Sequence, residues 1–381
     1  MARISLTRPG KRRPCSFPAR SAGGSHPDSS GRRSSHALPG VSVPFCLLVV
    51  TLAFCARADE PAAVPAGDAT WIASLRQAAE ALEWSDAIVR HDWRLQRRPG
   101  SDTCRILDPR DQCIQEGTHE ACLKAFHSLE EAGRIPAVRG PAVIVLHGLG
   151  EGRSSMQPIV QHLRKELDAT VLSVGYASPR AGIDDHGRGL ADVIAALPHA
   201  DRISFVGHSL GNLVVRRWMS LAPAADLARV HRMVMLGAPN QGSDLARMAS
   251  KFWILAALSN GAARDLVIDW PKVAPNLAVP TCPFGIVAGG KGDDRGFSTL
   301  LAGDDDAVVR VVETRLDGAE DFLLVPVSHA AMMKNTLVQQ ATVSFLETGR
   351  FAAAGGEAEQ PAGAAAAEPP ANPETPADAD E

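Results

Sequence analysis

A serine stands between two glycines in the sequence Gly207-His208-Ser209-Leu210-Gly211. The segment 203–206, Ile-Ser-Phe-Val, is mostly apolar and of strand length, and residues 210–221 carry apolar side chains at helical spacing. Gly-x-Ser-x-Gly between a strand and a helix is typical of a nucleophile elbow, a strained turn that holds the serine hydroxyl above the end of a sheet. The two glycines keep Cβ atoms out of a turn in which strand and helix nearly touch. The pattern also occurs in ordinary turns, but this context predicts that Ser209 is a nucleophile.

Such a serine needs a base and an acid, because its hydroxyl attacks only when a histidine takes the proton and a carboxylate holds that histidine in one tautomer. Around a nucleophile elbow the chain order is serine, acid, histidine. His329 fits this order, since it lies in a loop directly after the apolar run 322–325. His231 comes just before a strand, at the opposite end of a parallel sheet, and His208 flanks the serine and is expected to shape the turn. We therefore predict that His329 is the base.

The acid is expected at the end of the strand before His329, and the apolar run 284–288 is that strand. The aspartates that follow it are Asp293, Asp294, Asp304, Asp305 and Asp306. We choose Asp306, because the apolar pair after Ala307 would dock its loop on the domain, and Asp305 is the alternative. The three consecutive aspartates are also compatible with a solvated turn or a weak Ca²⁺ site, since calcium takes hard oxygen ligands.

Two backbone N–H groups are needed to bind the negative charge that develops on a substrate carbonyl oxygen. One is expected from Leu210, directly after the nucleophile. The other is expected from Leu149, because His147-Gly148-Leu149-Gly150 follows the early apolar run 142–146. A plain tight turn is the alternative interpretation of this segment.

Apolar runs of strand length recur along the chain, with helical patterns between most of them. Strands that alternate with helices predict a mostly parallel central sheet flanked by helices on both faces. The fold class is therefore α/β, in one domain from about residue 138 to residue 350. The predicted strands cover 142–146, 171–174, 203–206, 233–236, 284–288 and 322–325, and the predicted helices cover 156–167, 189–197 and 211–221.

The N-terminal segment, residues 1–58, carries nine Lys or Arg and one acid, and its apolar run ends in Ala56-Arg57-Ala58. That order is typical of a secretory signal peptide, so we expect export to the periplasm or the extracellular space, with an uncleaved N-terminal membrane anchor as the alternative. Residues 59–69, rich in Ala and Pro, are typical of a linker. The tail 351–381, without Lys or Arg, is an acidic Ala/Pro/Glu segment that cannot bury enough apolar surface to fold.

Residues 70–137 predict a small accessory segment of helix, hairpin and helix. The hairpin strands are 93–96 and 103–107, and the last helix begins at a Thr118 cap. The excursion 243–280 carries a stripe of bulky apolar residues from Leu245 to Ala256. We expect it either to pack on the core as a helix or to form a helical cap that receives an acyl chain and contacts a lipid or membrane surface.

Removal of residues 1–58 would leave Cys104, Cys113, Cys122 and Cys282, an even number that permits disulfides in an exported protein. Cys104 and Cys113 are close enough in sequence to bridge within the hairpin. The cysteine spacing matches no zinc pattern, so no metal site is expected from it. The middle of the chain is nearly balanced in charge, and no basic face predicts nucleic acid binding.

Taken together, the motifs at 145–150, 206–211 and 236–243, with His329, resemble the α/β hydrolases of the lipase-like group over residues 138–350. The resemblance implies an Asn-Asp-Gly-x-Val acid motif at 305–309, which points to Asp306. This chain has Asp305 for the asparagine and Ala307 for the glycine. The resemblance also implies a His-Gly-x oxyanion loop and ester substrates with medium or longer acyl chains.

We therefore expect a serine ester hydrolase of the lipase or esterase type that acts on small-molecule or lipid esters and needs no cofactor. An acyltransferase or a thioesterase would use the same residues, and the sequence also permits an amide or peptide hydrolase. A hydrolase-like binding protein without turnover is the alternative outside the enzymes. The sequence does not indicate an oligomeric state.

Overall fold

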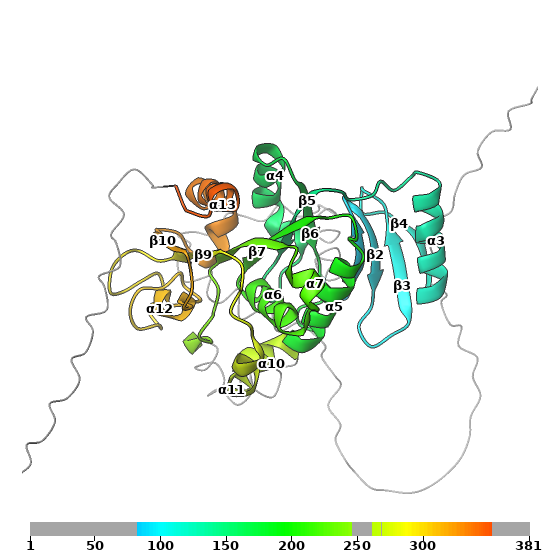
Figure 1. The fold of residues 1–381 in the computed structure, drawn as a ribbon. Helices are drawn as coiled ribbons and strands as arrows, with labels where there is room; N and C mark the ends of the chain where they lie inside the picture. The colour runs from blue at the N-terminus through cyan, green and yellow to red at the C-terminus, as the bar shows by residue number, and fades with distance from the viewer. Residues whose placement is uncertain (1–81, 246–260, 268, 353–381) are drawn as a thin grey trace, which may run out of the picture. The chain divides into compact units, whose positions relative to one another are not determined.

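The computed structural model describes residues 82–245, 261–267 and 269–352 (Figure 1). Several predictions lie outside these residues: the signal or anchor at 1–58, the linker at 59–69, the helix expected from residue 71, most of the apolar stripe from Leu245, and almost all of the acidic tail. Within the described ranges, no helix is both long enough and apolar enough to span a membrane.

A six-stranded sheet forms the centre of the protein, and all neighbouring strands in it are parallel. Its strand order is β10-β9-β8-β7-β5-β6. Each predicted strand is present, because continuous apolar runs are stable only where both faces of a sheet are covered. The predicted α/β class with a parallel central sheet is confirmed. The strands are β5 (Pro141–Leu146), β6 (Thr170–Val174), β7 (Arg202–His208), β8 (Val230–Leu236), β9 (Phe284–Gly289) and β10 (Asp321–Val325).

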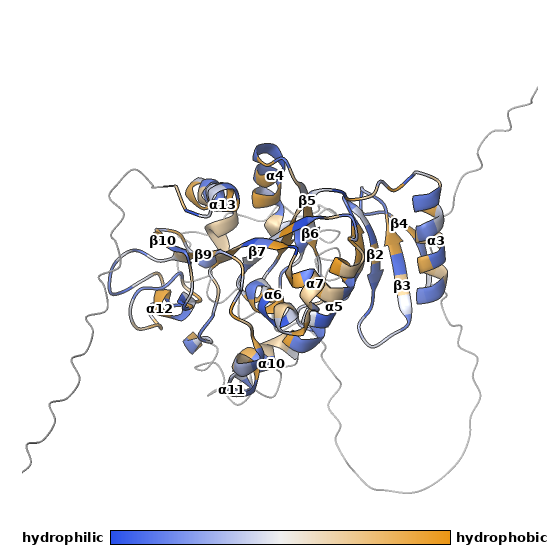
Figure 2. Cartoon of the chain, in the orientation of Figure 1, coloured by the Kyte–Doolittle hydropathy of each residue, from blue (hydrophilic) through white to orange (hydrophobic). Residues whose placement is uncertain are grey.

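Helices cover both faces of this sheet, and each face has its own apolar core. On one face, α5 (Ile183–Ala195) and α6 (Leu210–Leu221) pack in the first core. On the other, α4 (Gln157–Glu166) and α13 (Thr336–Thr348) pack in the second. The two pairs lie on opposite sides of β7 in Figure 1. Figure 2 shows hydrophobic and hydrophilic residues on the same helices, as expected where one side is packed and the other is in water.

Helix α5 begins six residues before the predicted start at 189, and a tertiary contact explains the difference. The cap residue Gly182 has no side chain to accept the first N–H groups of the helix. The Asp265 carboxylate on α10 (Gly261–Val267) accepts the Ile183 N–H instead, at 2.6 Å. The remaining short elements are η2 (Arg153–Met156), α7 (Ala224–Leu227), α11 (Trp270–Val273), η3 (Ala274–Asn276), α12 (Val311–Thr314) and η4 (His329–Lys334).

The N-terminal part of the described chain forms a separate four-stranded antiparallel sheet with one helix against it. Strands β2 (Trp93–Arg97) and β3 (Thr103–Leu107) are the expected hairpin. Two further strands, β1 (Ser85–Arg90) and β4 (Cys113–Thr118), extend it on both sides and were not anticipated. Helix α3 (His119–Glu131) follows, and the Thr118 hydroxyl accepts the Ala121 N–H as its cap.

This small sheet is attached to the edge of the large one by a buried ion pair. The Arg94 guanidinium donates to Asp86 at 2.6 Å and to the Ser173 carbonyl of β6 at 2.8 Å. Asp86 exchanges two hydrogen bonds with Gly175, at 2.9 and 2.7 Å. The Asp86 and Arg94 side chains are no more than 1% exposed. Strand β6 is an edge strand, and a covered edge cannot pair with another chain.

The bridge suggested between Cys104 and Cys113 is wrong in this structure. In the β3–β4 register Cys104 faces Gly117, whereas Cys113 faces Leu107 at the other end of the hairpin. Cys104 is buried and Cys113 is exposed, so the two thiols lie on different sides of the sheet. Cys104 instead shares a small apolar core with Cys122 of α3.

Candidate active site

Ser209 lies at the end of the central strand β7, in the turn that leads to α6. Its backbone angles are φ 51° and ψ −120°, a region that non-glycine residues rarely occupy and that costs about 1–3 kcal/mol. A Cβ on Gly207 would lie 2.4 Å from the Asn212 side-chain oxygen, and one on Gly211 would lie 2.8 Å from the His147 carbonyl oxygen. Both glycines are therefore required by packing, and the turn has the geometry of a nucleophile elbow.

The predicted acid and base are in contact. The Nδ1 atom of His329 lies 2.6 Å from Oδ2 of Asp306, and the His329 N–H donates to the Asp306 carbonyl at 2.7 Å. The other carboxylate oxygen of Asp306 accepts the N–H groups of Val308 and Val309, at 3.0 and 2.7 Å. Asp306 is fully buried and His329 is 8% exposed. The carboxylate is thus held from both sides, and it orients the imidazole through Nδ1.

The protonation of His329 follows from these surroundings. Burial by itself lowers the pKa of the imidazole, because the charged form loses its hydration. The charge and hydrogen bond of Asp306, with a smaller contribution from the charge of Glu151, outweigh burial and raise the pKa above its ordinary value. His329 is therefore a stronger base than a free imidazole.

The other two aspartates of the triplet are bonded elsewhere. Asp305 accepts the N–H groups of Ser298 and Ala307, at 2.9 and 2.7 Å. Asp304 accepts the N–H groups of Lys291 and Gly292, at 2.7 and 2.9 Å. These carboxylates close loops rather than converge on one point. No cluster of three or more potential metal ligands occurs among the residues that the structure describes.

Ser209 and the His329–Asp306 pair meet at the short backbone stretch after β8. The Ser209 N–H donates to the Leu236 carbonyl at 2.9 Å. A Cβ on the next residue, Gly237, would lie 3.1 Å from His329 Nδ1 and 3.2 Å from Asp306 Oδ2. Gly237 has φ 54°, so this close approach and the backbone conformation both favour glycine.

No hydrogen bond joins the Ser209 hydroxyl to His329 within the described part of the chain. Catalytic hydrogen bonds are often long without substrate and shorten when it binds.

The predicted oxyanion loop lies beside Ser209. A Cβ on Gly148 would be 3.2 Å from the Ser209 Cβ. The Gly150 N–H donates to the Ser178 hydroxyl at 3.0 Å, which fixes the far end of the loop. Among the described residues, the N–H groups of Leu149 and Leu210 have no hydrogen-bond acceptor, so both are available to a ligand.

Tyr176, the only tyrosine of the chain, supports this loop from below. Its ring stacks on the His147 ring with centroids 4.3 Å apart, and its hydroxyl donates to the His147 carbonyl at 2.5 Å. The His147 Nε2 accepts the Tyr176 N–H at 3.3 Å. Burial lowers the pKa of His147, so this imidazole is neutral.

Glu151 is a member of the site that the sequence analysis missed. Its Oε2 lies 3.3 Å from His208 Nδ1 and accepts the Gly148 N–H at 3.1 Å. Burial by itself would raise the pKa of this carboxyl, but the charge of His208 and hydrogen bonds from His208, Gly148 and Ser155 hold it well below its usual range. The signal that could have found Glu151 is its position in the sequence, directly after the His-Gly-x-Gly loop.

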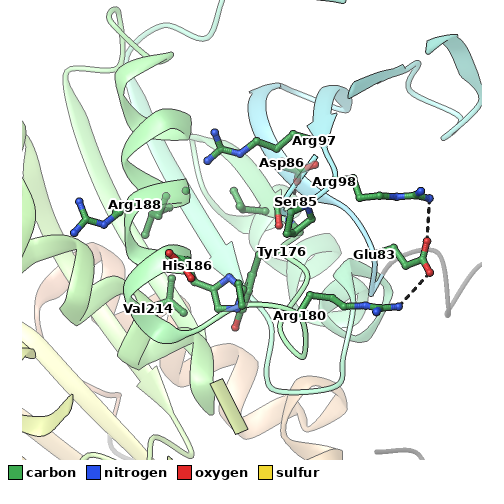
Figure 3. A pocket seen from close by; sticks show the side chains of 18 of the residues that line it. Glu83, Ser85, Asp86, Arg97, Arg98, Tyr176, Arg180, His186, Arg188 and Val214 are labelled. Atoms are coloured by element: carbon green, nitrogen blue, oxygen red, sulfur yellow. Dashed lines mark hydrogen bonds and ion pairs between the residues drawn. The ribbon is translucent and has the colours of Figure 1, made fainter. Parts of the chain in front are cut away.

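A cavity of about 960 Å³ lies between the N-terminal sheet and α5, and Tyr176 is among the residues that line it (Figure 3). Neither Ser209 nor His329 lines it. Two of its arginines, Arg98 and Arg180, pair with Glu83, as the dashed lines in Figure 3 show. The cavity therefore contains neither the candidate nucleophile nor the candidate base, although Tyr176 links it to the oxyanion loop.

Comparison with known proteins agrees with this geometry. Residues 142–259 match the family described as "Putative serine esterase (DUF676)", a stretch that contains both the oxyanion loop and Ser209. The match confirms a resemblance to serine esterases over these residues. No curated protein matched the chain.

Solved structures of similar fold include three hydrolases. The mature lipase BlEst2 of Bacillus licheniformis is 18% identical, with a TM-score of 0.43 over 57% of this chain and 96% of the lipase. Phospholipase PlaB of Legionella pneumophila, in complex with thio-NAD, is 19% identical, with a TM-score of 0.42 over 55% of this chain and only 56% of PlaB. The metagenomic carboxyl esterase MGS0156 is 17% identical, with a TM-score of 0.40 over 52% of this chain and 68% of that esterase. At these identities and scores the likenesses carry no argument about the substrate.

Proposed function

We propose that this protein is a serine hydrolase that cleaves carboxylic esters through an acyl-enzyme formed on Ser209. One observation carries the proposal. A serine in a strained turn and an aspartate-bonded histidine approach the same backbone stretch, Leu236–Gly237, from two sides. This is the arrangement that activates a hydroxyl for attack on a carbonyl carbon.

In the first half-reaction, the Ser209 oxygen forms a bond to the ester carbonyl carbon while His329 Nε2 takes the hydroxyl proton. The negative charge on the carbonyl oxygen is bound by the N–H groups of Leu149 and Leu210. Asp306 holds the proton on Nδ1 and stabilises the imidazolium that forms. The bond to the alcohol oxygen then breaks, and His329 gives its proton to the leaving alcohol.

In the second half-reaction, His329 takes a proton from water as the water oxygen attacks the acyl carbon. The bond to the Ser209 oxygen breaks, and the proton returns to that oxygen, which releases a carboxylic acid. The serine and histidine end in their starting states, and no step calls for a cofactor.

We propose esters with medium or longer acyl chains, in small molecules or lipids, as the substrates. The His-Gly-x form of the loop at 147–149 and the apolar stripe from Leu245 to Ala256 support this proposal. The same stripe would contact a lipid or membrane surface. We also propose export from the cytoplasm, on the basic and apolar pattern of residues 1–58.

The test uses the purified full-length protein, a fluorescent fluorophosphonate, and p-nitrophenyl esters of graded acyl length. We expect the parent to be labelled and to release p-nitrophenol, and Ser209→Ala to do neither. Ser220→Ala is the matched control, because Ser220 is an exposed serine at the end of α6 that bonds only to Arg217. Labelling of Ser209→Ala at the parental level would refute the assignment.

The same assay separates hydrolysis from acyl transfer. With a free alcohol added, a hydrolase yields mainly the carboxylic acid, whereas an acyltransferase yields the new ester. Parallel assays with a thioester and an amide of the same acyl chain identify the preferred leaving group.

A further inference from the structure

One oxygen of the Glu151 carboxylate contacts three different parts of the site. Its Oε2 accepts the Gly148 N–H of the oxyanion loop at 3.1 Å and the Ser155 hydroxyl at 2.9 Å, and it lies 3.3 Å from His208 Nδ1. The backbone N–H of Glu151 also donates a hydrogen bond to the Gly148 carbonyl, at 3.4 Å. The turn from 148 to 151, which contains Leu149, is therefore closed by both the backbone and the side chain of Glu151.

The partner histidine is part of the nucleophile elbow. His208 directly precedes Ser209 and is 1% exposed. A Cβ added to Gly148 would lie within 3.3 Å of Ser209, His208 and Glu151 at once. The carboxylate therefore ties the loop that holds one oxyanion donor to the turn that holds the nucleophile and the other donor. If this tie is lost, the Leu149 and Leu210 N–H groups are no longer held in one geometry.

The Glu151–His208 pair also lies beside His329, the proposed base. The ring centroids of His208 and His329 are 4.5 Å apart, with 42° between the ring planes. The titratable groups that face His329 are Asp306 after β9, His208 at the end of β7 and Glu151 after β5. The negative charge of Glu151 favours the imidazolium form of His329, the form that appears during the attack.

We infer that Glu151 is a positioning residue for the reaction at Ser209: it holds the oxyanion loop against the nucleophile elbow through Gly148 and His208. The inference rests on the proposed function, since it assigns how that site is held in shape. Glu151 touches neither Ser209 nor His329 by a hydrogen bond within the described residues, so it acts through Gly148 of the loop and His208 of the elbow.

Two substitutions test this role. Glu151→Gln keeps an oxygen that can accept the same three bonds but removes the charge. Glu151→Ala removes both. We expect Ala to lower kcat about 10²–10³-fold, the size of losing one oxyanion donor, with KM changed little. Gln should recover at least about tenfold of that loss, because its side-chain oxygen still holds the loop against the elbow.

The experiment measures kcat, KM and pH profiles of p-nitrophenyl ester hydrolysis, with fluorophosphonate labelling and thermal unfolding of each variant. Glu166→Gln is the control, since it makes the same charge change at an exposed position at the end of α4. If the parent neither labels nor turns over, the proposed function fails, and this inference fails with it. If the parent works, parental kcat in Glu151→Ala or equal losses in Gln and Ala each overturn the inference alone. Should the Ala variant fail to fold, the Gln variant decides: a loss of kcat of about 10²-fold or more in Glu151→Gln overturns the inference, and a smaller loss with unchanged KM supports it.

Discussion

Replacing Asp306 by asparagine tests the site most directly, because the structure determines which way the new amide must face. One oxygen of Asp306 accepts two backbone N–H groups, from Val308 and Val309. The other oxygen bonds His329 Nδ1. An asparagine can place its oxygen in only one of these positions, and its NH₂ group takes the other.

If the NH₂ group faced the two backbone donors, the buried N–H of Val309 and the partly buried N–H of Val308 would lose their acceptor, at a cost of about 1–3 kcal/mol for the buried group alone. The amide oxygen therefore stays with Val308 and Val309, and the NH₂ group faces His329. A donor opposite Nδ1 forces the imidazole proton onto Nε2, which can then no longer take the Ser209 proton. Such a tautomer error lowers kcat about 10⁴-fold, equivalent to about 5 kcal/mol of transition-state stabilisation.

The assay is the plateau kcat of p-nitrophenyl ester hydrolysis for Asp306→Asn and for Asp305→Asn. Concentrations of active enzyme come from fluorophosphonate labelling, and circular dichroism checks that both variants are folded. Asp305→Asn should keep most of its kcat, because that carboxylate bonds only to the backbone of its own loop region. More than about a tenth of the parental kcat in Asp306→Asn would refute the assignment, and so would a larger loss in Asp305→Asn.

Two further predictions follow from the charges of the buried groups. The value of kcat/KM should fall as the pH falls through the pKa of His329. The midpoint should lie above that of a free imidazole, about 6.5, because the charge and hydrogen bond of Asp306 outweigh burial. A midpoint below about 6.5 contradicts this reasoning. Asp86→Ala should destabilise the fold by about 3–5 kcal/mol, since it leaves the buried Arg94 without its counter-charge. Denaturant unfolding measures the loss, and Asp192→Ala, which breaks an exposed ion pair, should show little change.

The central sheet was predictable because its evidence is local. A run such as 142–146 or 284–288 is apolar at every position, and only a strand buried on both faces suits that composition. The starts of helices were less predictable. Helix α5 begins at Ile183 because a carboxylate from α10, distant in sequence, caps it. Strands β1 and β4 are half polar, and they form because the docked edge of β6 and the β2–β3 hairpin offer them partners.

The residues of the candidate site likewise fall into those that the sequence predicts and those that only tertiary contacts identify. The sequence by itself singled out Ser209 and His329 as candidate nucleophile and base, because an elbow needs glycines at 207 and 211 and a base is expected after a late strand. Among three consecutive aspartates it offered only a preference, since neighbouring residues share the same local pattern. Only the tertiary structure brought Asp306 to His329 and sent Asp304 and Asp305 to backbone donors of their own loops.

Tertiary structure also decided the roles of Gly237 and Glu151. In the sequence, Gly237 is only one residue of the motif at 236–243. The structure shows why a glycine stands there, because His329 and Asp306 leave little room for a side chain. Glu151 follows a glycine-rich loop and has no periodicity of its own. It acts through contacts with His208, 57 residues further along the chain. Short-range patterns specify which residues can do chemistry, and the distances between loops of separate strands, which no local pattern encodes, decide which of them meet.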